Sequence, residues 1–110
     1  MRRSLCLAIL TVVGVGLAWA TNEAQEPRHP IRPLEVANNL FMLTSHPTGQ
    51  GMRTGGNTAV FVQANGVTLV DTKIKGYGED ILTQVRAITD KPITTIVNTH
   101  THWDHSGSNP

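Results

Sequence analysis

The chain has 110 residues, of which 39% are hydrophobic and 15% are charged. This length suits a single domain, and the apolar content argues against a disordered chain. A net charge of +1 gives no broad attraction to nucleic acid or to acidic membranes, and a single cysteine excludes a disulfide within the chain.

The first 20 residues have the pattern of an export signal. A basic start at residues 2–3 precedes an apolar run over 5–20, which closes on the small-x-small sequence Ala18-Trp19-Ala20. The run is short for a membrane span, because the core of a bilayer requires about 20 apolar residues. The pattern therefore predicts a cleaved signal peptide over 1–20, with an uncleaved anchor as the alternative. It also predicts a periplasmic or secreted protein that contacts the membrane only transiently, through this signal.

Residues 21–33 are polar and contain three prolines, a composition typical of an extended linker. The apolar runs 34–37 and 40–44 then flank Asn38-Asn39, and a hairpin is expected because asparagine tolerates the positive φ of a tight turn. The β-rich runs 58–64 and 67–71 around Asn65-Gly66 predict a second hairpin. The glycine-rich segment 45–56 between the hairpins is predicted to be a flexible loop.

A helix and one more strand follow the hairpins. Apolar residues recur at helical spacing within 79–89, at Ile81, Val85 and Ile88. The β-branched residues that open the segment 93–99 predict a buried strand. The connection from Asp71 is long enough for a crossover helix, so the last two strands are expected to be parallel neighbours. Their carboxyl ends then share one edge of the sheet, which brings Asp71 close to the residues after 99.

The segment His100-Thr101-His102-Trp103-Asp104-His105 holds three of the five histidines of the chain. Imidazole and carboxylate are preferred zinc ligands. Residues two apart in extended backbone point to the same side, so His100 and His102 can bind one ion. As the chain bends, Asp104 and His105 can turn towards a second ion, and two ions that share a water lower its pKa and supply hydroxide near neutral pH. The alternative is a set of surface histidines, or one core histidine held by Asp104.

Other residues near this motif and elsewhere carry weaker signals. Trp103 is predicted to pack within the loop and not to bind a cofactor. Asp71, a carboxylate at the end of a strand, is expected to bond to local backbone or to orient a neighbouring ligand, with direct metal binding as the alternative. His29 and His46 lie in polar segments, where exposure to solvent is expected.

The stretch Asn98-Thr-His-Thr-His-Trp-Asp-His-Ser-Gly-Ser-Asn109 resembles the metal-binding signature of the metallo-β-lactamase-fold hydrolases. Segments 57–62 and 67–72 are similar to the strands that precede it in that family, so the resemblance covers about 34–110. It implies an α/β fold with α+β layers: the N-terminal half of an αβ/βα sandwich, with two hairpins followed by a βαβ unit. The partial domain is therefore expected to span 34–110, after the linker over 21–33.

The resemblance also implies roles for the motif. His100 and His102 would bind a first zinc ion, and Asp104 and His105 a second. Asp104 would also act as the catalytic residue that orients the nucleophile or transfers protons. Asp71 matches the strand-end aspartate that supports the motif loop in this family. The tryptophan within the motif is similar to that of glyoxalase II and related thioesterases.

The expected function is that of an exported zinc-dependent hydrolase, with two zinc ions per complete domain and iron or manganese as alternatives. Metal-bound hydroxide would attack an ester, amide, lactam or thioester-type bond of a small-molecule substrate; phosphate and sulfate esters stay open, and nucleic acid is not an expected partner. The family's remaining ligands lie after this motif, so the chain is expected to be an N-terminal fragment with little activity of its own. The alternative is a non-catalytic secreted metal-binding module or an inactive fragment, and no oligomeric state is predicted.

Overall fold

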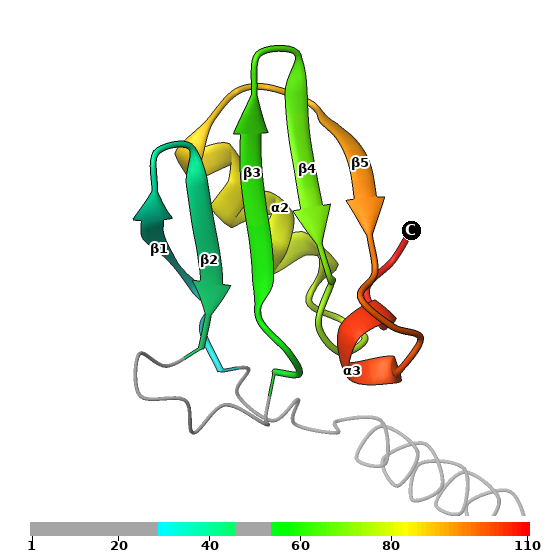
Figure 1. Ribbon diagram of the computed structural model, residues 1–110. Helices are drawn as coiled ribbons and strands as arrows, with labels where there is room; N and C mark the ends of the chain where they lie inside the picture. Colours follow the sequence, from blue (N-terminus) through cyan, green and yellow to red (C-terminus); the bar gives the residue numbers. More distant parts are fainter. Residues whose placement is uncertain (1–28, 46–53) are drawn as a thin grey trace, which may run out of the picture.

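The computed structural model describes residues 29–45 and 54–110. The predicted signal peptide over 1–20, most of the predicted linker and His46 lie outside the described residues. The elements in chain order are β1 (Arg32–Ala37), β2 (Leu40–Thr44), β3 (Thr58–Gln63), β4 (Gly66–Val70), α2 (Gly78–Ile88), β5 (Ile93–Val97) and α3 (Trp103–Ser106) (Figure 1). No helix within 29–45 and 54–110 has the length and apolar character that crossing a membrane requires.

The described strands form one mixed sheet in the order β1-β2-β3-β4-β5. The first four strands are antiparallel neighbours, and β5 runs parallel to β4 after the crossover through α2 (Figure 1). The predicted α+β arrangement, two hairpins followed by a βαβ unit, is confirmed. The first hairpin turns at Asn39, whose φ of 60° is the left-handed conformation that asparagine tolerates.

The first strand begins earlier than the apolar pattern indicates. β1 starts at Arg32, and Ile31 is only 3% exposed. The hydroxyl of Tyr77 donates a hydrogen bond of 3.2 Å to the carbonyl of His29, which ties this segment to the start of α2. Residues 31–33, which the composition assigned to the linker, therefore belong to the folded domain.

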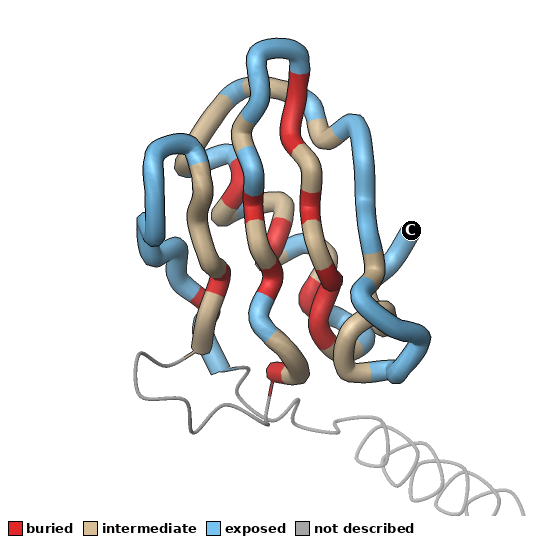
Figure 2. The backbone as a smooth tube through the Cα atoms, viewed as in Figure 1, coloured by how far each residue is buried: buried red, intermediate tan, exposed pale blue. Residues whose placement is uncertain are grey.

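The core lies between α2 and one face of the sheet, where Figure 2 shows the buried positions of β3, β4 and the helix. Ile81 and Val85 are the buried residues of α2, one turn apart. The sheet residues buried in the same cluster are Leu43, Val60, Val67 and Leu69. Burying apolar side chains contributes about 25 cal/mol per Å² removed from water, so this cluster is the main source of stability for the domain.

The last strand differs from the sequence prediction. β5 was expected to be buried, but every residue from 94 to 97 is exposed. The physical reason is position: β5 is an edge strand, and only its Ile93 end packs against the core cluster. β-branched composition fits a strand but does not determine whether the strand is covered.

The far face of the sheet, opposite α2, carries a row of apolar side chains. The cross-strand partners in this row, one from each strand, are Leu34, Met42, Ala59, Val70 and Val97. We call this set the apolar row. Its two ends are exposed and its three middle members are partly exposed. Among the described residues, no helix covers this face (Figure 1).

Candidate metal centre

The candidate site lies where two parallel strands end. β4 ends at Val70 and β5 at Val97, and the amide of Asp71 donates a hydrogen bond of 2.8 Å to the carbonyl of Val97. The amide of Thr72 donates a hydrogen bond of 2.7 Å to the carbonyl of His105. The chain after β5 therefore folds back against the chain after β4, and α3 lies beside this edge (Figure 1).

Three of the four predicted ligands converge at this edge. One ligand atom each from His100, Asp104 and His105 lies within 4.8 Å of the other two. The ring centroids of His100 and His105 are 4.1 Å apart, and Nε2 of His105 lies 3.6 Å from Oδ2 of Asp104. His102 is outside this group, although its ring centroid lies 4.6 Å from that of His100. Asp104 and His105 are consecutive residues in the single turn of α3.

Asp71 supports the site from beneath. Its side chain is 6% exposed, and its Oδ2 lies 2.7 Å from Nδ1 of His105. Thr99 donates twice to the same carboxylate, from its amide to Oδ1 and from its hydroxyl to Oδ2, each at 2.8 Å. Burial alone raises the pKa of Asp71, but the hydrogen bonds from His105 and Thr99 outweigh it and hold this pKa below its ordinary value. Asp71 is thus an ionised carboxylate that orients a neighbouring histidine.

The donor set fits a divalent metal ion. Because Nδ1 of His105 donates to the ionised Asp71, a neutral ring keeps its lone pair on Nε2. Nε2 of His105 lies 3.6 Å from the carboxylate oxygen of Asp104, so one cation could be bound by both atoms. Two imidazoles with a carboxylate suit zinc, iron or manganese.

The glycine pair before β3 packs against the motif. The amide of Gly56 donates a hydrogen bond of 2.9 Å to the carbonyl of Asp104, and Gly55 adopts a left-handed φ of 77°. A Cβ atom on Gly56 would lie 2.5 Å from Cε1 of His105. Residues 54–56, the end of the segment predicted to be a flexible loop, are therefore a fixed wall of the site. The adjacent glycines were the sequence signal for this close approach.

Gly56→Ala is expected to displace the His105 ring and to weaken zinc binding by about tenfold or more, because a methyl group cannot share the space of the imidazole. The zinc affinity of the full chain is measured by isothermal titration calorimetry. The matched control is Gly78→Ala, where the nearest atom to the added methyl group is 3.9 Å away, at the Ser108 carbonyl. Equal zinc affinity in the two variants would contradict the packing role of Gly56.

Lys73 is a buried cation that the sequence analysis missed. Its side chain is 0% exposed, and its Nζ donates a hydrogen bond of 2.9 Å to the carbonyl of Gly56. Burial lowers the pKa of Lys73 to about 8, because the charged form loses its hydration. Asp71 and Lys73 both have a φ of 63°, so each adopts the left-handed conformation that L residues rarely adopt. A lysine after a strand gives no sequence signal for such burial.

Trp103 is placed differently from its prediction. Its side chain is 72% exposed and does not pack within the loop. It is the first residue of the single turn α3, in which Asp104 and His105 face the site. Because Asp104 and His105 take the side of the turn that faces the site, the Trp103 side chain points to solvent.

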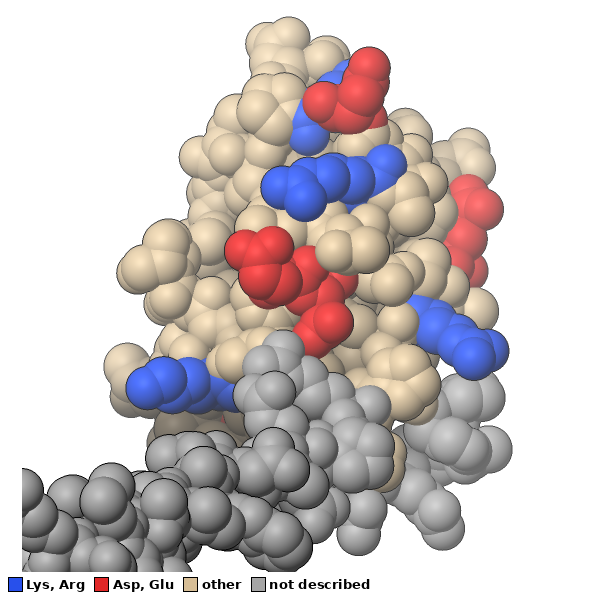
Figure 3. Space-filling view, turned by 180° about the vertical axis from the view of Figure 1, so that it is seen from behind, with Lys and Arg blue, Asp and Glu red and all other residues tan. Residues whose placement is uncertain are grey.

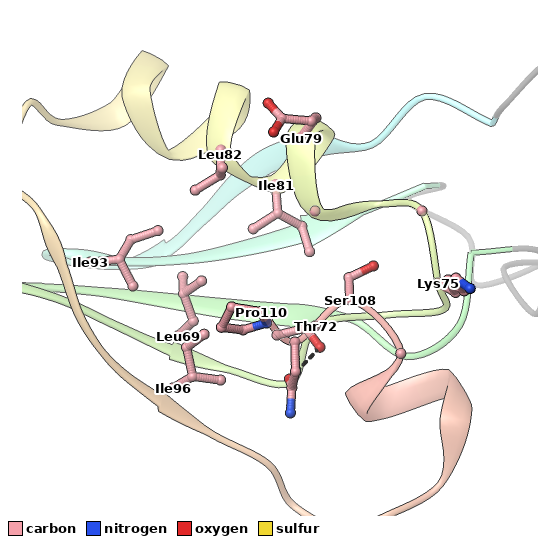
Figure 4. Close-up of a pocket in the computed structure, with 14 residues that line it drawn as sticks. Leu69, Thr72, Lys75, Glu79, Ile81, Leu82, Ile93, Ile96, Ser108 and Pro110 are labelled. Carbon is pink, nitrogen blue, oxygen red and sulfur yellow. Dashed lines mark hydrogen bonds between the residues drawn. The ribbon is translucent and has the colours of Figure 1, made fainter.

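A cavity of about 660 Å³ lies beside the site, between α2, the strands β4 and β5, and the last residues of the chain (Figure 4). Its apolar lining comes mainly from Leu69, Ile81, Leu82, Ile93 and Ile96. At its polar end the hydroxyl of Thr72 donates a hydrogen bond of 2.8 Å to Asn109 (Figure 4). None of the three converging ligands lines this cavity. The back of the molecule in the view of Figure 1, shown in Figure 3, carries acidic and basic side chains next to each other.

Comparisons with known proteins place this geometry in context. Residues 51–110 match the family model of the Metallo-beta-lactamase superfamily. The chain is similar to the metallo-beta-lactamase FIM-1 from Pseudomonas aeruginosa in its mono-zinc form, with a TM-score of 0.59, 24% identity, and coverage of 74% of this chain and 38% of that one. No curated protein sequence gives a significant match.

Two further solved structures agree. A Cronobacter sakazakii metallo-beta-lactamase has a TM-score of 0.58 and 18% identity over 74% of this chain and 29% of its own. A B3 metallo-beta-lactamase with an active-site glutamic acid has a TM-score of 0.58 and 26% identity over 81% of this chain and 31% of its own. The chain thus spans between 29% and 38% of the length of these structures.

Proposed function

This chain belongs to the metallo-beta-lactamase superfamily, and from that premise we propose that it is the N-terminal part of an exported zinc-dependent hydrolase. Its substrate is a small molecule with an ester, amide, lactam or thioester-type bond. The observation that carries the proposal is the convergence of His100, Asp104 and His105 at the ends of two parallel strands, with Asp71 holding one of the imidazoles.

The roles of the residues follow from their positions. His100, Asp104 and His105 would hold metal, and His102 lies next to His100, where a second ion of the complete domain would bind. A bound zinc ion acts as a Lewis acid and activates water at neutral pH, and iron or manganese suits the same ligands. Asp104, whose side chain is 31% exposed, orients the attacking water and accepts its proton. Asp71 keeps His105 in place throughout.

Two surfaces support the proposal that this segment works with a further part of the fold. The apolar row and the cavity beside the site both leave hydrophobic side chains in contact with solvent. A sheet in a soluble protein packs both apolar faces against other layers, and exposed patches of this kind mark surfaces that bind protein. The proposed export rests on the sequence pattern of residues 1–20, and the mixed charges give no reason to add nucleic acid as a partner.

Removal of the proposed ligands tests the metal site. His100→Ala is expected to weaken zinc binding to the full chain by at least about tenfold, because one of three converging donors is lost. In the complete domain, His102→Ala is expected to remove at least one of two ions. Zinc content is measured by elemental analysis after equilibrium dialysis, with His29→Ala as the control histidine. Full zinc occupancy in both ligand variants would refute the ligand assignment.

Activity separates the enzyme from the alternative of a non-catalytic metal-binding module. The exported protein is purified with its metal from the organism that makes it. It is then assayed against chromogenic esters, lactams and thioesters. Turnover of one class that disappears with His100→Ala supports the hydrolase. Full metal content without turnover of any of these substrates favours the metal-binding module. An intact-mass measurement of the exported protein shows which residues the protein contains.

A further inference from the structure

Thr99 lies between the supporting carboxylate and a proposed metal ligand. Its hydroxyl oxygen is 2.8 Å from Oδ2 of Asp71 and 2.9 Å from Nδ1 of His100. Its amide fixes the same carboxylate through Oδ1 at 2.8 Å. The three groups thus form a hydrogen-bonded chain from the Asp71 carboxylate through the Thr99 hydroxyl to the His100 imidazole, which is one of the proposed metal ligands.

The protons in this chain can be assigned by counting donors. A hydroxyl has one proton, and an ionised carboxylate only accepts hydrogen bonds. The Thr99 hydroxyl must therefore donate to Asp71, and it can only accept from its other neighbour. Nδ1 of His100 must then be the donor of the 2.9 Å contact, and it carries the proton of the neutral ring. This leaves the lone pair of His100 on Nε2.

The same carboxylate orders the second imidazole directly. Nδ1 of His105 donates to Oδ2 of Asp71 at 2.7 Å, so His105 also has its lone pair on Nε2. The two rings lie 4.1 Å apart between centroids and belong to the converging ligand group. Asp71 therefore sets the proton position of two imidazoles, one by contact and one through Thr99. Ligand histidines in proteins generally need such a partner on the ring nitrogen that does not bind the metal.

We propose that Thr99 is a positioning residue that holds the proton of His100 on Nδ1 and so keeps Nε2 free to bind the metal. This inference rests on the proposed function, because it assigns Thr99 to the same site. The hydroxyl is needed for the effect and the methyl group is not. Serine should therefore replace threonine, whereas valine, which has the same shape without the hydroxyl, should not.

The first readout is the proton position itself, in the metal-free full chain. Long-range proton–nitrogen NMR at about pH 8, where free imidazole is neutral, distinguishes a proton on Nδ1 from one on Nε2. His100 is expected to carry it on Nδ1 in the wild type and in Thr99→Ser. In Thr99→Val the signal is expected to shift to the Nε2–H form or to a mixture. His100→Gln assigns the resonance.

The second readout is zinc affinity, measured by calorimetry. Thr99→Val is expected to bind zinc about 10–100-fold more weakly than the wild type, and Thr99→Ser within about threefold. The matched control is Thr101→Val, an exposed threonine in the same loop, whose backbone carbonyl accepts a hydrogen bond from the Ser106 hydroxyl and whose side chain forms no hydrogen bond in the described structure. Thr99→Ala provides the same test if the valine variant does not fold by circular dichroism.

The outcomes separate this inference from the proposed function. An Nδ1–H ring and wild-type affinity in both Thr99→Val and Thr99→Ala would overturn the inference and leave the metal site intact. A chain that binds no zinc would refute the proposed function, and with it the claim that Thr99 serves a ligand. Equal losses in Thr99→Ser and Thr99→Val would also overturn the inference, because the hydroxyl would then not be the active group.

Discussion

Asp71→Asn is expected to lower the free energy of unfolding by about 2–3 kcal/mol at pH 6 and to weaken zinc binding by about 10–100-fold. The carboxylate accepts hydrogen bonds from the amide and hydroxyl of Thr99 and lies against Nδ1 of His105. An amide at this position has one acceptor oxygen and places an NH₂ group against at least one of these donors. The buried donor that loses its partner accounts for the loss of stability.

The pH dependence of this variant has a definite sign. The folded-state pKa of Asp71 lies below the unfolded value, so its stabilising contribution is present above the unfolded pKa of 3.8 and disappears as pH falls through the folded pKa. The difference between the wild type and Asp71→Asn is therefore expected to shrink as the pH falls below 3.8. Urea unfolding at several pH values measures it, with the exposed Asp90→Asn as the control. A pH-independent difference would show that the loss arises from shape and not from charge.

Lys73→Met is expected to change the alkaline stability profile more than any other lysine substitution in the described residues. Burial lowers the pKa of Lys73 from 10.5 to about 8, and this difference corresponds to a penalty of about 3 kcal/mol for the charged form. Between these two values the unfolded chain binds more protons than the folded chain, so wild-type stability rises with pH. Below about pH 8 the folded protein carries the full penalty.

Methionine removes both the charge and the hydrogen bond to the carbonyl of Gly56. The wild type is therefore expected to gain about 3 kcal/mol relative to Lys73→Met as pH rises from about 8 to 10.5. Urea unfolding across this range measures the difference. Lys91→Met is the matched control, since Nζ of Lys91 also donates to a backbone carbonyl, that of Gln63, at 2.8 Å. A flat difference between wild type and Lys73→Met would mean that the ammonium is hydrated in solution.

Local patterns determined much of the fold in advance. Asn38-Asn39 and Asn65-Gly66 located the two hairpins, and the observed α2, Gly78–Ile88, lies one residue from the predicted helix at each end. These features depend on short-range backbone preferences, which the sequence states directly. The consecutive spacing of the motif likewise predicted that several of its side chains would meet, and the structure brings His100, Asp104 and His105 together.

Other features depend on neighbours that are distant in the sequence. Trp103 is exposed because its two successors turn inward, and β5 is exposed because it is an edge strand. Lys73 is buried because Gly56, seventeen residues earlier, offers its carbonyl. Thr99 acquires a role only because the crossover connection places Asp71 beside it. No periodicity or composition reports such encounters, since each requires the strands to be already in place.

The apolar row exposes hydrophobic side chains to water when this polypeptide is alone in solution, and that exposure is unfavourable. Leu34 and Val97 lie at its two ends, and the row as a whole crosses all five strands of the sheet. Two copies meeting face to face would remove this surface from water without any change of backbone, which favours self-association at high concentration. Replacing Ala59, at the centre of the row, by lysine would keep the copies dispersed, and it would equally prevent any other layer from seating there.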